Sequence, residues 1–133
     1  ELHGREDGAP PPVDLAKERA HAELVRRLIQ DGKVNAVHDV ADGGLLVALT
    51  EMALASGRGC VLQEIGDAFT AFGEDQARYV VTSAHADHIQ AAGIPMTRIG
   101  TVSGDAVAGP RFSVAVAELR AAHESFFKDW MES

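Results

Sequence analysis

Two glycines and two carboxylates meet in the segment VHDVADGG, residues 37–44, where a β-branched stretch changes to an apolar helix. A strand, a glycine turn and a helix N-terminus together direct backbone N–H groups at an anion, which makes Gly43 and Gly44 candidates for phosphate binding. Asp39 and Asp42 would repel a bare phosphate, because like charges about 4 Å apart cost roughly 1 kcal/mol in water. Mg²⁺ would reconcile the two features, since carboxylates and substrate phosphates are its usual ligands. The motif therefore suggests a nucleotide site in which Asp39 and Asp42 hold Mg²⁺.

The same turn has a purely structural interpretation. Asp42 could cap the following helix by accepting a hydrogen bond from an amide two or three residues on, worth about 1 kcal/mol. Asp39 could close the turn with its own side chain. The spacing matches neither the phosphate loop nor the three-glycine dinucleotide fingerprint, so on spacing alone we favour the capped turn.

A second polar motif, FGEDQARYVV, spans residues 72–81 at the entrance to an expected strand. Carboxylate, amide and guanidinium groups at one strand entrance can orient a polar ligand by hydrogen bonds. The candidate binding residues are Glu74, Asp75, Gln76 and Arg78. The alternative is an exposed turn in which Arg78 pairs with a neighbouring carboxylate, and composition alone favours it.

Other chemically capable residues have simpler interpretations. His38 lies inside an expected strand and is more typical of a packed, hydrogen-bonded histidine than of a base. Cys60 begins an apolar strand with no base beside it, which favours a buried structural thiol. His85 and His88 have a metal-compatible spacing but no further paired ligands, which favours an exposed helix face. No catalytic residue is assigned.

Composition excludes some partners. The 133 residues include 20 acidic and 12 basic side chains, a formal charge of -8, and the basic residues are scattered, so nucleic acid is not an expected partner. The longest apolar runs are far shorter than the roughly 18 to 20 residues that cross a bilayer, so no membrane contact is expected. The single cysteine suits a reducing compartment, and we take a cytoplasmic location as the default.

The helices and strands that must position these motifs are predicted from capping and turn residues and from the spacing of apolar residues. Three consecutive prolines end a polar stretch, so residues 1–13 are expected to be a linker or domain edge and residues 14–133 one domain. Asp14 can cap a helix over 14–30, and Gly57 can end a second helix that begins near Leu45. Strands are predicted over 33–40, 59–65, 77–84, 97–102 and 111–116, and further helices over 84–95 and 115–131. This order predicts an α+β fold, a mixed β-sheet with helices packed on it.

Together, VHDVADGGLLVALTEMA (37–53) and FGEDQARYVVT (72–82) resemble the C-terminal domain of the synthetase component of phosphoribosylformylglycinamidine synthase, in the aminoimidazole ribonucleotide synthetase-related superfamily. The usual pattern there is His-Asp-Val-Ser-Asp-Gly-Gly-Leu, a helix carrying Glu-Met, and later Phe-Gly-Glu-Asp/Ser-Gln-x-Arg. The segments GREDGAPPPVDLAKE, IGTVSGD and LRAAHESFF extend the likeness over nearly the whole chain. One difference is Ala41, at a position where a serine is common. The alanine lacks the hydroxyl that could form a hydrogen bond with a ligand or with the turn.

The resemblance implies a purine-biosynthesis ligase that uses ATP to activate the formyl amide oxygen of formylglycinamide ribonucleotide. Ammonia then displaces phosphate to give the amidine. Family members obtain this ammonia from glutamine through a glutaminase subunit or domain, with a small accessory subunit as a further partner. The synthetase is duplicated, and this chain, which begins with Glu1, resembles the last domain of its second half.

By the same resemblance, the first-half counterpart of Asp39 holds magnesium, and the counterparts of Glu74, Asp75 and Gln76 contact the ribonucleotide. Pseudo-symmetry would place these positions here at an auxiliary site for ATP or ADP with Mg²⁺. The family's catalytic histidine has no counterpart in this chain, so we expect binding rather than catalysis, and no activity from the chain alone. The alternatives are a non-catalytic nucleotide-binding or structural module, or another member of the superfamily.

Overall fold

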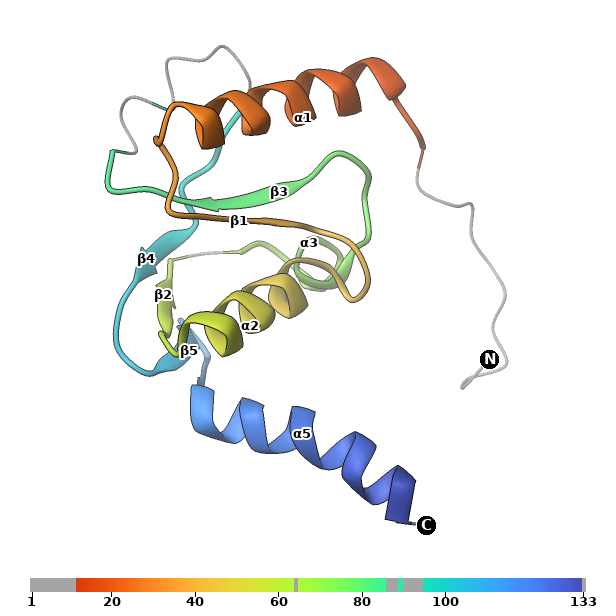
Figure 1. Cartoon of the computed structure of the whole chain (residues 1–133), viewed down its shortest axis with the longest axis vertical. Coiled ribbons are helices and arrows are strands. Elements are labelled where there is room, and N and C mark those ends of the chain that lie inside the picture. Colours follow the sequence, from red (N-terminus) through yellow and green to blue (C-terminus); the bar gives the residue numbers. More distant parts are fainter. Residues whose placement is uncertain (1–11, 64, 86–88, 90–94, 133) are drawn as a thin grey trace.

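The computed structural model describes residues 12–63, 65–85, 89 and 95–132 (Figure 1). All but two residues of the expected linker 1–13 therefore lie outside the described residues, as does most of the helix expected over 84–95. None of the described helices is long and apolar enough to cross a membrane.

The first helix, α1 (Leu15–Gln30), begins where the sequence predicts it. The Asp14 carboxylate accepts hydrogen bonds from the Ala16 and Lys17 amides, each at 3.0 Å, which satisfies two of the free N–H groups at the helix start. Gly32 follows the last turn with a φ of +62°, a conformation that glycine adopts without steric cost. The buried side chains of α1 form a small core cluster with Ile89; they are Leu24 and Leu28.

Strands β1 (Ala36–Asp39) and β3 (Tyr79–Thr82) form a two-stranded antiparallel sheet, with Asp39 opposite Tyr79. In Figure 1, α1 and α2 lie on opposite sides of this pair. The register places the end of β1 beside the beginning of β3. Both polar motifs of the sequence are thus brought to one end of the sheet.

Helix α2 (Gly44–Ser56) forms the centre of the main core. Its N-cap is Gly43, and it ends at Gly57, whose φ is +68° and whose amide donates to the Ala53 carbonyl at 2.8 Å. The buried residues of α2 are Gly44, Leu45, Ala48, Leu49 and Ala53. They pack in one cluster with Val40, Leu62, Val80, Val107 and Val116. One helix therefore joins the β1–β3 pair to the second sheet.

The second sheet has the strand order β4-β2-β5-β6. Its strands are β2 (Cys60–Leu62), β4 (Gly100–Val102), β5 (Ala106–Gly109) and β6 (Phe112–Ala115). Strands β2 and β5 are parallel, whereas the other neighbours are antiparallel, so this sheet is mixed. Helix α5 (Val116–Glu132) follows β6 directly and packs its first turns on α2.

The predicted α+β class with a mixed sheet is confirmed, but the strands divide between two sheets. Two elements have no counterpart among the predicted ones. Helix α3 (Ala68–Phe72) has only five residues, too few for a helical period to show in the sequence. Strand β5 reads AVAG, which lacks the alternation of apolar and polar residues that marks a strand.

Candidate functional site

The site is formed by two loops, the acidic turn (residues 39–44) and the Arg78 loop (residues 73–78). The β1–β3 pairing brings the two loops together. This pairing continues past Asp39 through a hydrogen bond from the Val40 amide to the Arg78 carbonyl at 2.9 Å. A hollow of about 250 Å³ lies between them. Its lining includes all the predicted polar side chains of both motifs: Asp39, Asp42, Glu74, Asp75, Gln76 and Arg78. The two motifs, which are separated in the sequence by residues 45–71, thus share one site.

The two glycine amides of the acidic turn are bonded within the chain. The Gly43 amide donates to Glu74 Oε1 at 2.9 Å, and the Gly44 amide donates to the Ala41 carbonyl at 3.0 Å. The Glu74 carboxylate thus occupies the position at the helix N-terminus where an anionic ligand would bind. A phosphate would have to displace Glu74 to reach the Gly43 amide. The anion-binding role of the two glycines stays a prediction.

The structural alternative for Asp42 is wrong. The N-cap of α2 is Gly43, with a φ of +79°, and a glycine has no side chain with which to bond the helix amides. Within the described residues, the Asp42 carboxylate has no hydrogen-bond partner. Its neighbour Asp39 has a side chain that is 67% exposed and lies 3.6 Å from His38 Nδ1. Both carboxylates of the turn therefore remain accessible to a cation.

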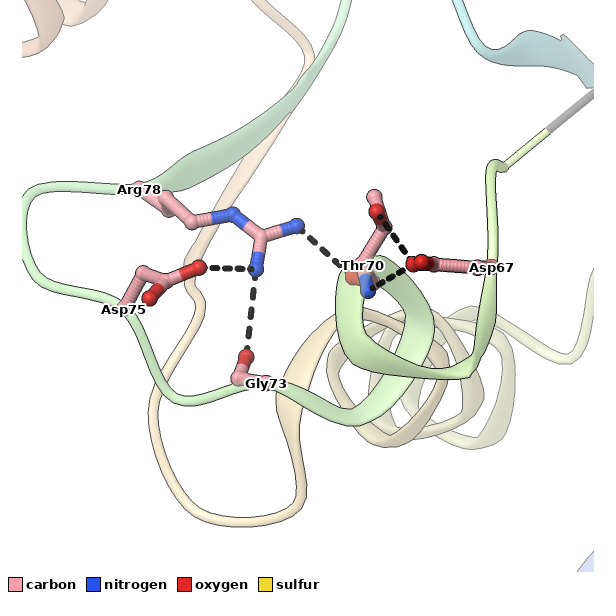
Figure 2. A network of polar contacts seen from close by, with 5 residues as sticks. All are labelled: Asp67, Thr70, Gly73, Asp75 and Arg78. Carbon is pink, nitrogen blue, oxygen red and sulfur yellow. Dashed lines mark hydrogen bonds and ion pairs between the residues drawn. The ribbon is translucent and has the colours of Figure 1, made fainter. Parts of the chain in front are cut away.

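Arg78 is bonded mainly to the backbone of α3. Its guanidinium donates to the Gly73 carbonyl at 3.1 Å and to the Thr70 carbonyl at 3.0 Å, and it lies 3.8 Å from the Asp75 carboxylate (Figure 2). These carbonyls are at the end of α3, where helical partners run out. The predicted pairing of Arg78 with a nearby carboxylate is present, but the two carbonyl bonds are shorter, and no sequence signal indicated them.

The other end of α3 is held by Asp67. Its carboxylate accepts hydrogen bonds from the Thr70 amide at 2.9 Å and the Thr70 hydroxyl at 3.0 Å (Figure 2). These bonds favour the charged form and lower the pKa of Asp67. Helix α3 is therefore fixed at both ends, and it carries the Arg78 loop.

Helix α1 also reaches the site, which the motifs did not predict. Glu18 lines the hollow beside the two loops. One turn later, His21 Nδ1 lies 2.7 Å from the carbonyl oxygen of Ala77. His21 and Ala77 are 56 residues apart, and neither belongs to a recognisable motif, so only the folded chain reveals this contact.

His38 and Cys60 behave as structural residues. His38 Nδ1 lies 2.6 Å from the Asp39 carbonyl, and Nε2 lies 3.2 Å from the Glu51 carboxylate, as predicted for a hydrogen-bonded strand histidine. Cys60 is partly buried, and burial raises the pKa of its thiol. A raised pKa keeps the thiol protonated near neutral pH, which agrees with a structural role rather than a nucleophile.

Comparison with known proteins assigns the chain to a family. The family described as AIR synthase related protein, C-terminal domain, matches residues 1–111. The chain belongs to this family. Its sequence is 55% identical over 132 residues to phosphoribosylformylglycinamidine synthase subunit PurL of Novosphingobium aromaticivorans, a match that covers 99% of this chain and 17% of that relative. The PurL subunit of Erythrobacter litoralis is 47% identical over 145 residues, covering 98% of this chain and 19% of the relative.

A solved structure shares the fold. The structure of T. maritima PurL complexed with FGAR superposes with a TM-score of 0.69 at 17% sequence identity, covering 88% of this chain and 23% of that one. The resemblance stated from the two sequence motifs is thus confirmed. The chain spans less than a fifth of the length of the two curated relatives.

The match to PurL extends further than the match to the AIR synthase related family as a whole. The family match ends at residue 111, before β6 and α5, whereas the match to N. aromaticivorans PurL includes nearly every residue of the chain. The segment that forms strand β6 and helix α5 is therefore part of the match to N. aromaticivorans PurL and lies outside the family match.

The carboxylates of the hollow can be judged against the ligands that a magnesium ion needs. Among the described residues, no group of three or more His, Cys, Asp or Glu side chains is close enough to hold a metal. Mg²⁺ needs no such cage, because it usually keeps several waters and binds one or two carboxylates together with phosphate oxygens. The exposed carboxylates of Asp39 and Asp42 are ligands of this kind, and both line the hollow.

Proposed function

We propose that residues 14–133 form the C-terminal domain of a phosphoribosylformylglycinamidine synthase. This enzyme converts formylglycinamide ribonucleotide, ATP and ammonia to the amidine, ADP and phosphate in purine biosynthesis. The observation that carries the proposal is the 55% identity to PurL over 99% of the chain, including the two elements beyond the general family match. The chain's own part in that reaction is ligand binding, because its site holds carboxylates, an amide and a guanidinium but no nucleophile with an adjacent base.

We infer that the ligand is ATP or ADP with Mg²⁺, and T. maritima PurL has been solved complexed with ADP. Asp39 and Asp42 would hold the ion on one side of the hollow. When bound, the ion would supply the positive charge that offsets the repulsion between these carboxylates and a phosphate group. Gln76 would donate its amide to a polar ligand group, and Glu74 would have to release the Gly43 amide if that amide is to bind phosphate.

Calorimetric titration of Mg·ADP tests the binding role. The unsubstituted chain should bind ADP only when Mg²⁺ is present, and Asp39→Asn should weaken binding at least tenfold because one metal ligand loses its charge. Asp105→Asn is the matched control: it makes the same chemical change at an exposed aspartate just before β5, away from the hollow, and should leave affinity unchanged. Binding that needs no metal, or that Asp39→Asn leaves intact, would refute the magnesium role.

A turnover assay tests the division between binding and catalysis. The 133-residue chain with formylglycinamide ribonucleotide, ATP, Mg²⁺ and ammonia should give no amidine. Amidine formation by the chain alone would overturn the assignment of catalysis to the rest of the synthetase.

The partners follow from the same proposal. The remaining synthetase domains, a glutaminase subunit or domain and a small accessory subunit would complete the enzyme; the PurLQS structure of Thermotoga maritima is consistent with such an assembly. Co-purification of the complete synthetase with its glutaminase would support the partner assignment, and a synthetase that stays alone under turnover conditions would count against it.

A second function, a purely structural domain, is favoured by one specific observation. Three groups that could bind a ligand are engaged within the chain: the Gly43 amide, the Gly44 amide and the Arg78 guanidinium. If Mg·ADP does not bind at millimolar concentration, this second function replaces the first.

A further inference from the structure

The Arg78 loop contains an unusual backbone conformation. Ala77 is the non-glycine residue with a positive φ, +62°, among the residues that the structure describes. An L-residue with a Cβ is disfavoured in this region because the Cβ approaches the neighbouring carbonyl oxygen. Such a conformation persists only where its surroundings hold it. Ala77 lies between Gln76 and Arg78, both of which line the hollow.

The contact that holds Ala77 comes from α1. His21 is partly buried, and its Nδ1 lies 2.7 Å from the Ala77 carbonyl oxygen. A carbonyl oxygen only accepts hydrogen bonds, so His21 must carry a proton on Nδ1 and donate it. The next carbonyl along the chain, that of Arg78, accepts from the Val40 amide at 2.9 Å. Two successive peptide groups are therefore fixed, one by α1 and one by the acidic turn.

We propose that His21 is a positioning residue of the nucleotide site: it clamps Ala77 in its left-handed conformation and so keeps the Arg78 loop against the acidic turn. The inference rests on the proposed function for its ligand, but the clamp itself follows from the contacts. If the clamp opens, the Arg78 loop relaxes, and two reporter hydrogen bonds weaken with it. These are the bonds from the Val40 amide to the Arg78 carbonyl and from the Gly43 amide to Glu74.

A pair of isosteric variants isolates the hydrogen bond. His21→Asn keeps an N–H donor near the position of Nδ1, whereas His21→Leu has the same branched shape without a donor. Hydrogen exchange followed by NMR should show the Val40 and Gly43 amides exchanging about tenfold faster in His21→Leu, with values near those of the unsubstituted chain in His21→Asn. The α5 amides should not change in either variant, and His123→Leu, on the exposed face of α5, is the control.

A second substitution separates a clamp from simple packing. Ala77→Gly removes the Cβ that disfavours a positive φ, so the loop needs less support. Added to His21→Leu, it should restore at least part of the lost protection of Val40 and Gly43. A side chain that only fills space would not be replaced by a change at residue 77. Unchanged exchange in His21→Leu, or no recovery with Ala77→Gly, would overturn the clamp.

Affinity for Mg·ADP links the clamp to the site. His21→Leu should raise the Kd about five- to tenfold, and His21→Asn should return it to within about twofold of the unsubstituted value. If the unsubstituted chain does not bind Mg·ADP, the proposed function fails, while the exchange data still decide whether His21 positions the loop. If the chain binds but His21→Leu binds equally well, the clamp has no part in binding and the inference fails alone.

Discussion

The two loops of the site differ in what their polar side chains contact. In the acidic turn, the Asp42 carboxylate has no hydrogen-bond partner among the described residues, and the Asp39 carboxylate lies 3.6 Å from the adjacent His38. In the Arg78 loop, the guanidinium donates to one carbonyl of α3 and to that of its C-cap, Gly73, and the Glu74 carboxylate accepts a hydrogen bond from the Gly43 amide. The first loop presents free charges, whereas the second uses its charges to maintain shape. Sequence motifs of similar polarity can therefore serve a ligand or serve the fold.

The acidic turn also touches the end of α3 through backbone, and this contact requires glycine. A Cβ built on Gly44 would lie 2.5 Å from the Phe72 carbonyl carbon and 2.7 Å from its Cα, and Gly44 has a φ of +76°. The start of α2 can therefore approach the end of α3 only because residue 44 has no side chain. Conversely, Asp39 and Asp42 are exposed and make no comparable contact.

The largest effect on stability is expected at Gly44, where the acidic turn meets the end of α3. Gly44→Ala introduces both a strained φ and a clash with the rigid backbone of Phe72, which together should lower the free energy of unfolding by about 3 to 5 kcal/mol. Urea denaturation followed by circular dichroism measures the loss.

Gly57→Ala is the matched control for this change. Gly57 also has a positive φ, +68°, but a Cβ there would meet nothing within 4 Å. Its substitution should cost only about 1 kcal/mol, from backbone strain alone. Equal losses at the two glycines would mean that α2 and α3 can separate without penalty, and the close approach would lose its importance.

The next largest effect is expected from Arg78→Lys, which distinguishes the hydrogen-bond geometry of Arg78 from its positive charge. Arg78→Lys keeps the positive charge near Asp75, but an ammonium cannot bond the Gly73 and Thr70 carbonyls with the geometry of a guanidinium. We expect a loss of about 1 to 2 kcal/mol in the free energy of unfolding. Arg98→Lys is the control, because Arg98 makes one exposed hydrogen bond, to Thr101. A loss no greater than that of Arg98→Lys would show that only the charge of Arg78 matters.

Much of the fold could be predicted from local signals. The Asp14 cap and the left-handed Gly57 are signals carried by a few adjacent residues, and both are confirmed. The burial of Leu45, Ala48 and Ala53 follows from helical spacing in the same way. Helix α3 has only five residues, too few to show a helical period, so the sequence did not predict this helix, which carries the Arg78 loop.

The candidate site was harder to predict because its contacts are distant in sequence. Both motifs were identified, and the structure brings them together around one hollow. The role of Asp42 as a cap was wrong, because a glycine in the left-handed region occupies the N-cap, and the carboxylate that accepts its amide comes from Glu74. The bonds from the Gly43 amide to Glu74 and from His21 to the Ala77 carbonyl depend on tertiary packing, which residue spacing does not encode.

A smaller effect depends on pH at the support of the Arg78 loop. Hydrogen bonds from Thr70 lower the pKa of Asp67 in the folded chain, so its stabilising contribution is present above the unfolded pKa and is lost as the pH falls through the folded value. Asp67→Asn does not titrate. The Tm of the unsubstituted chain should therefore fall relative to that of Asp67→Asn as the pH is lowered below about 4, the ordinary aspartate pKa.

Thermal unfolding at pH 7, 5, 4 and 3 measures this difference, with Asp105→Asn as a control at a carboxylate outside α3. The same pH dependence in both variants would assign the effect to the chain's overall charge. In that case Asp67 would not be a specific support of the loop.

The smallest effect on stability is expected in the acidic turn. Because the Asp42 carboxylate is exposed and has no hydrogen-bond partner within the described residues, Asp42→Asn should change the free energy of unfolding by no more than about 0.5 kcal/mol. The same variant should weaken Mg·ADP binding in calorimetry, since the turn's carboxylates act only when a cation is present. A change that spares the fold and reduces binding separates this turn from the Arg78 loop, where Arg78→Lys should reduce stability first. If Asp42→Asn instead destabilises the chain by as much as Arg78→Lys, both loops serve the fold, and the purely structural function becomes the better account of the domain.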